Sequence, residues 1–178
     1  RANGQWSSIM TRIVSVWLQR WPVRRFLKEQ SRNPSPAEPV EPEVDAARAA
    51  YRQARISADV EPFLFDMGRR LRQADLVVCR AGATTLAEIT AAGKAAILIP
   101  LPTATDDHQR KNAEALGNAG ASEVLLQKDA TGPVLADRIQ ALAADRDRRL
   151  RMTAAARTFA KPQAAKVIVD RALELAGG

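Results

Sequence analysis

The stretch that decides the fold is ADLVVCRAGATTLAEITAAGKAAILIP, residues 74–100. Two continuous apolar runs, 74–79 and 95–99, flank a segment at 84–92 that has helical spacing and is followed by Gly93. Continuous apolar runs are typical of strands buried on both faces of a parallel sheet. Glycine commonly follows the last residue of a helix. The stretch therefore predicts a strand, a helix and a second, parallel strand.

The segments on either side continue this alternation. Downstream, the pattern predicts a helix capped by Asp107 and reaching Gly120, a strand at 122–126, and three helical stretches up to Leu175, the first beginning at Thr131-Gly-Pro. Upstream, it predicts a helix at 45–55, an extended segment at 58–60, and a helix capped by Asp66 that reaches Gln73. Strands separated by single helices favour parallel units with right-handed crossovers. The predicted fold class is α/β, with a Rossmann-like parallel sheet.

Residues 1–44 differ in character from residues 45–178. They contain all three tryptophans and five of the ten prolines. Apolar residues at helical spacing within 9–21, with arginines around them, predict a short basic amphipathic helix that could lie on an anionic membrane surface; a plain surface helix or an unstructured leader is the alternative. Residues 31–43, with four prolines, are expected to be a linker. Neither a signal peptide nor a membrane-spanning helix is expected.

The composition limits the class of protein. The 178 residues, 46% hydrophobic and 26% charged, are enough for one globular domain and argue against a disordered chain. A single cysteine, Cys79, excludes an intrachain disulfide and favours a reducing compartment. The net charge of +7 favours an anionic partner, such as a phosphate, a lipid surface or a nucleic acid.

Two loops of the predicted sheet carry the candidate chemistry, because ligands of open parallel sheets bind where the strands end. The first loop, residues 79–85, enters a helix with small residues, and Glu88 is expected in the first turn of that helix. Free amides at a helix start can hold an anion, and a nearby carboxylate can accept both hydroxyls of a ribose. The loop matches neither a P-loop nor a three-glycine dinucleotide motif. The alternative interpretation is that the small residues serve packing and that Glu88 is a solvated charge.

The second loop, residues 100–109, leads to His108, Gln109 and Asn112, which are expected near the same edge. Amide side chains suit sugar hydroxyls because they both donate and accept hydrogen bonds. With one histidine in the sequence, a Ser-His-Asp triad and a histidine-based metal site are both excluded within this chain. The pair Asp106-Asp107 suggests a metal for a pyrophosphate, or more simply a helix cap.

Taken together, residues 75–88, 93–102 and 107–113, with PFLFDM at 62–67 upstream, resemble the C-terminal half of the bacterial peptidoglycan GlcNAc transferase family, which converts lipid I to lipid II. The resemblance extends from about Asp45 to the C-terminus. It implies the donor-binding domain of a GT-B glycosyltransferase that uses UDP-GlcNAc, works without a metal or other cofactor, and inverts the anomeric centre. It also implies a cytoplasmic protein that is peripheral on the inner face of the cell membrane.

The resemblance assigns roles residue by residue. The backbone near Phe63 and Leu64, with Met67, would face the uracil, and Glu88 would hold the ribose hydroxyls. Gly82, Ala83, Thr84 and Thr85 would lie against the diphosphate, whereas Gln109 and Asn112 fall where the family contacts GlcNAc, with His108 beside them.

The chain departs from this family in what precedes the matching part. The N-terminal acceptor domain, which is expected to supply the catalytic base and to bind lipid I, and a Gly-Gly-Ser loop do not occur in this sequence. No catalytic residue is therefore expected in this chain, which is predicted to be inactive alone. Residues 1–44 suggest a frameshifted or misassembled gene; the alternative is a two-chain enzyme with the acceptor domain on a partner. A basic nucleic-acid-binding module is disfavoured because no aromatic stacking surface accompanies the charge.

Overall fold

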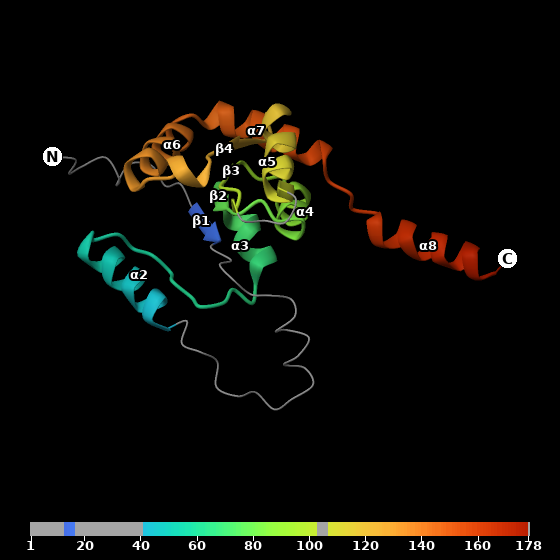
Figure 1. The fold of residues 1–178 in the computed structure, drawn as a ribbon, viewed down its shortest axis with the longest axis horizontal. Coiled ribbons are helices and arrows are strands. Elements are labelled where there is room, and N and C mark those ends of the chain that lie inside the picture. Colours follow the sequence, from blue (N-terminus) through green and yellow to red (C-terminus); the bar gives the residue numbers. More distant parts are fainter. Residues whose placement is uncertain (1–12, 17–40, 103–106, 178) are drawn as a thin grey trace. The chain divides into compact units, whose positions relative to one another are not determined.

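The computed structural model describes residues 13–16, 41–102 and 107–177. The described residues fall in two compact units, one comprising 13–16 with 68–177 and the other 41–67. Along the chain (Figure 1), the elements are β1 (Ile13–Val16), α2 (Glu41–Gln53), α3 (Met67–Gln73), β2 (Leu76–Cys79), α4 (Ala83–Ala92), β3 (Ala96–Leu98), α5 (His108–Asn118), β4 (Ser122–Val124), the 3₁₀ helix η2 (Gln127–Asp129), α6 (Gly132–Ala144), α7 (Arg146–Thr158) and α8 (Ala164–Ala176).

The strands form one parallel sheet in the order β1-β2-β3-β4. In the register, Val77 lies beside Ala96, and Ala96 lies beside Ser122. Every residue of β2 and β3 is buried, as their continuous apolar runs predict. Single helices, α4 and α5, connect β2 to β3 and β3 to β4. The predicted Rossmann-like α/β architecture is therefore confirmed.

Strand β1 corrects the expectation of a helix across residues 9–21. Residues 13–16 form a strand that pairs in parallel with β2, with Ile13 beside Leu76 and Val16 beside Cys79. The segment IVSV is rich in β-branched residue types, which favour strands, and a short apolar run fits helical and extended periodicities alike. Pairing with the edge of β2 supplies the backbone hydrogen bonds that decide between them. The rest of the expected helix, and all three tryptophans, lie outside the described residues.

Local signals fix several helix ends as predicted. Gly93, which follows α4, adopts the left-handed conformation with φ +57°, and its N–H donates to the Thr90 carbonyl at 3.0 Å. Thr131 precedes α6, and its hydroxyl accepts a hydrogen bond from the Val134 N–H at 3.5 Å. A glycine after the last turn and a threonine before the first are the residues that these positions favour.

The core lies between the sheet and the helices that follow it. Apolar side chains from β2, β3 and their flanks pack with Leu142 of α6 and Met152 of α7, and the cluster comprises Leu76, Val78, Ala95, Ile97, Ile99, Leu125, Leu142 and Met152. Helix α7 also contacts α4, and α5 contacts β4 (Figure 1). This packing fixes the carboxyl ends of β2, β3 and β4, from which the candidate loops leave.

Helix α2 starts earlier than the sequence predicts. It begins at Glu41, before the predicted start at Asp45 and within the expected linker. Proline is tolerated in a first helical turn, and acidic residues are favoured there.

Helix α8 has no buried residue. Its exposed apolar side chains are Val167, Ile168, Val169, Leu173 and Leu175. Within the ranges described, no helix combines the length and apolar character needed to cross a bilayer.

Candidate functional site

The carboxyl ends of β2, β3 and β4 meet at one edge of the sheet, where the sequence places the candidate chemistry. The segment after β2 enters α4, the segment after β3 leads to α5, and the segment after β4 leads to η2. Parallel strands bring these exits together because all strands run in the same direction. Residues of the first two loops are consequently neighbours in space although they are distant in sequence.

The start of α4 is open to an anion. Gly82 is the residue before the helix, with extended φ and ψ of −68° and 143°, and no side chain caps the first turn. Thr84 is exposed and Thr85 is half-buried. The amides of a first turn have no partner within their own helix, and the helix dipole favours negative charge beside them. Gly82, Ala83, Thr84 and Thr85 thus lie together at an N-terminus that can hold a phosphate.

Glu88 lies further along α4 than expected. The helix starts at Ala83, so Glu88 is its sixth residue, and the first turn contains no acidic residue. The expectation that Glu88 lies in the first turn is therefore wrong, because a turn holds only 3.6 residues. Its carboxylate is exposed, so it is available to a ligand hydroxyl.

The start of α5 reaches both loops through two amide side chains. The Leu101 N–H donates to Gln109 Oε1 at 3.0 Å, and Asn112 Nδ2 donates to the Ala81 carbonyl at 3.2 Å. His108 is exposed at the first position of the helix. The structure thus brings Gln109 and Asn112 to the strand edge, as predicted, and shows that each already makes one hydrogen bond within the protein.

Asp107 precedes α5, as predicted, but it does not cap the helix with its side chain. It has a positive φ of 59°, and its carboxylate pairs with the guanidinium of Arg110. A left-handed backbone at this position turns the carboxylate away from the first-turn amides, so the ion pair replaces the expected cap. Asp106 lies outside the described residues. Elsewhere in the described chain, no three acidic, cysteine or histidine side chains lie close enough to hold a metal ion.

Phe63, Leu64 and Met67, the residues expected near the uracil, belong to the 41–67 unit. The Phe63 ring is 59% exposed and packs edge-on against the Phe65 ring, with the ring centres 4.8 Å apart. Leu64 and Met67 are half-buried. Their role at a base stays a prediction.

Arg80 is a buried cation at this edge to which the sequence analysis gave no role. Its NH1 atom donates to the Ile99 carbonyl at 3.1 Å and to Gln127 Oε1 at 2.5 Å, and the residue is only 7% exposed. Burial lowers the pKa of Arg80, yet a guanidinium stays protonated at physiological pH. The signal in the sequence is a lone charge that directly follows a fully apolar strand, since such a charge needs partners from other segments.

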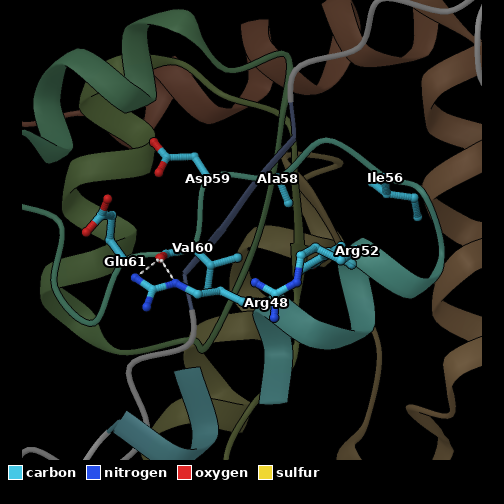
Figure 2. A pocket seen from close by; sticks show the side chains of 8 residues that line it. Arg48, Arg52, Ile56, Ala58, Asp59, Val60 and Glu61 are labelled. Atoms are coloured by element: carbon cyan, nitrogen blue, oxygen red, sulfur yellow. Dashed lines mark hydrogen bonds between the residues drawn. The ribbon is translucent and has the colours of Figure 1, made fainter. Parts of the chain in front are cut away.

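A hollow of about 320 Å³ lies in the 41–67 unit, and none of the predicted site residues lines it. Figure 2 shows Arg48 and Arg52 from α2 beside the segment 58–61. Arg48 donates from Nε and NH2 to the Val60 carbonyl at 3.1 Å and 2.9 Å. These bonds join the helix to the segment that follows it.

Comparisons with known proteins identify the family of this fold. A family model described as the glycosyltransferase family 28 C-terminal domain matches residues 32–168. Curated relatives from Trichlorobacter lovleyi and Acidithiobacillus ferrooxidans are 48% and 51% identical, each over 134 residues. Both are named UDP-N-acetylglucosamine–N-acetylmuramyl-(pentapeptide) pyrophosphoryl-undecaprenol N-acetylglucosamine transferase.

The match covers most of this chain and a minor part of each relative. It includes 75% of this chain in both cases, but 35% and 37% of the two relatives. The crystal structure of Acinetobacter baumannii MurG aligns with a TM-score of 0.66 and 39% identity, covering 73% of this chain and 38% of that one. The chain therefore spans about a third of the length of these relatives. The family model covers most of the chain and the fold agrees with the solved structure, so the chain belongs to the glycosyltransferase family 28 C-terminal domain family.

Proposed function

We propose that this chain is the donor-binding part of a transferase that moves GlcNAc from UDP-GlcNAc to lipid I, yielding lipid II for peptidoglycan. The names of its relatives supply the donor and the acceptor. The observation that carries the proposal is a pair of hydrogen bonds, in which Gln109 accepts from the Leu101 N–H and Asn112 donates to the Ala81 carbonyl. The Asn112 bond holds the polar start of α5 against the loop that opens α4, and the Gln109 bond ties the segment after β3 to the same helix, so that a sugar and a diphosphate can be held side by side.

The diphosphate, the ribose and the sugar of UDP-GlcNAc each have candidate partners at this edge. The amides at the start of α4, with Thr84 and Thr85, suit the diphosphate. The Glu88 carboxylate accepts hydrogen bonds from the ribose hydroxyls, and amide side chains such as Gln109 both donate to and accept from the hydroxyls of GlcNAc. The helix dipole stabilises the departing UDP electrostatically, so no metal is required.

In the proposed reaction, the bond from the anomeric carbon of GlcNAc to the diphosphate oxygen breaks and UDP keeps the electron pair. The acceptor hydroxyl forms the new bond to that carbon, with inversion, and its proton passes to a base. We assign the base and the lipid I site to an acceptor domain outside this sequence, on the same gene product or on a partner chain. Such an enzyme would work at the inner face of the cell membrane, as a peripheral protein.

Calorimetry on the purified 178-residue chain, with chelator present, tests the donor site. UDP and UDP-GlcNAc should bind, and Glu88→Gln should weaken binding by roughly 1–3 kcal/mol because a charge-assisted hydrogen bond is lost. Glu174→Gln is the matched control, since Glu174 is an exposed carboxylate on α8 paired with Arg171. Equal binding by the wild type and Glu88→Gln would remove Glu88 from the site.

Two further outcomes would contradict the proposal as a whole. A chain that does not bind UDP but binds a single-stranded oligonucleotide tightly would favour the nucleic-acid alternative. Measurable lipid II formation by the purified chain alone would show that a base and an acceptor site exist here, because positioning and proton transfer both need groups assigned to the acceptor domain.

A further inference from the structure

One buried side chain joins the carboxyl ends of three neighbouring strands. Arg80 is the first residue after β2, Ile99 is the first after β3, and Gln127 begins η2 just after β4. The Arg80 guanidinium donates to the Ile99 carbonyl and to the Gln127 side chain. A single cation therefore cross-links segments that are 19 and 47 residues apart in sequence.

The same loop is held from its other side by α5. Asn112 donates to the carbonyl of Ala81, and Ala81 itself is fully buried. Arg80 and Ala81 lead directly into Gly82, the residue before α4. The backbone that aims the first-turn amides of α4 is thus fixed at two consecutive residues by partners from three different segments.

Arginine is a costly residue for packing alone. Removing a guanidinium from water carries a desolvation penalty, which an apolar side chain of similar length would not carry. The guanidinium fixes the positions of its acceptors, because its donors lie in a planar fork. The arrangement therefore favours precise placement of the loop over maximal stability.

We propose that Arg80, acting through Ile99 and Gln127, is a positioning residue that presets the loop 80–82 so that the start of α4 can receive a diphosphate. This inference rests on the proposed donor site. If the loop spends only a fraction of its time in the competent geometry, the apparent dissociation constant rises by the inverse of that fraction. Arg80 does not need to touch the ligand for its loss to weaken binding.

The test measures UDP binding by calorimetry and amide hydrogen exchange at residues 81–85 in the full chain. Arg80→Met should weaken UDP binding about ten- to hundredfold and speed exchange in the loop, as expected when a charge-assisted hydrogen bond is lost. Arg80→Lys, which keeps the positive charge but not the planar fork of donors, should restore part of the affinity. Gln127→Leu alters an exposed residue and is expected to fold; it should weaken UDP binding about three- to tenfold.

Arg149→Met is the matched control. Arg149 is also an arginine that donates to backbone carbonyls, but its acceptors, Leu142 and Ala143, lie at the C-terminal end of α6. Its loss should lower the unfolding midpoint and leave UDP affinity and loop exchange unchanged. Unchanged UDP affinity and loop exchange in Gln127→Leu and folded Arg80→Met would overturn the inference. If the wild type binds no UDP, the proposed function fails, and the exchange data alone still decide whether Arg80 presets the loop.

Discussion

Gly93 offers a test of how the end of α4 is packed. It is buried, has a φ of +57°, and a Cβ placed on it would meet the Arg157 side chain, with Cγ at 2.8 Å and Cδ at 3.1 Å. Gly120 has a similar φ of +70°, but a Cβ there would have no neighbour within 4 Å. The two glycines therefore separate the cost of backbone strain from the cost of overlap with a neighbour.

Gly120→Ala should lower the free energy of unfolding by about 1–2 kcal/mol, the cost of a left-handed conformation for a residue with a Cβ. Gly93→Ala should cost that amount plus about 1–2 kcal/mol, because the Arg157 stem must move out of its packed position. The additional loss corresponds to a Tm lower by about 2–8 °C for a chain of this size. Urea unfolding followed by circular dichroism at 222 nm measures both free energies.

Arg157→Ala completes the design by removing the side chain that causes the overlap. In an Arg157→Ala background, the cost of Gly93→Ala should fall to within about 0.5 kcal/mol of the cost of Gly120→Ala. The reasoning would be refuted if Gly93→Ala costs no more than Gly120→Ala, or if its cost is the same with and without the Arg157 side chain.

Three further predictions concern other parts of the fold. Burial raises the pKa of the Cys79 thiol to about 12 from 9.0. As the pH rises, the thiol therefore ionises first in the unfolded chain, so the free energy of unfolding should fall by about 2–3 kcal/mol between pH 9 and 11. Cys79→Ala should flatten this dependence on pH in urea titrations. Lys94 Nζ donates to the carbonyls of Arg72 and Ala74 at the end of α3, so Lys94→Met should cost about 1–2 kcal/mol at pH 7, and an unchanged urea midpoint would contradict this. The exposed apolar side of α8 should make the chain self-associate at high concentration, and Val169→Glu should reduce light scattering without changing the unfolding midpoint; a variant that unfolds would show that α8 is part of the core.

The sequence predicts where the candidate site lies better than it predicts the hydrogen bonds within the site. Small residues at 82–85 and polar residues at 108–112 follow two apolar strands, and parallel strands end at a common edge. These two features locate the loops. They do not reveal that Asn112 is bonded to Ala81, or that Glu88 lies beyond the first turn of α4. Those details depend on where a helix starts and on how two loops pack.

Local patterns along the chain are enough to predict β2, α4, β3 and the later helices, because continuous apolar runs, Gly93 and Thr131 are signals that act over a few neighbouring residues. Tertiary structure decided the rest. Residues 13–16 became a strand by pairing with β2, and Arg80 found its partner 47 residues away. A hydrogen bond between distant segments forms only when the folded sheet brings its donor and acceptor together. The periodicity of residues along the chain therefore does not predict it.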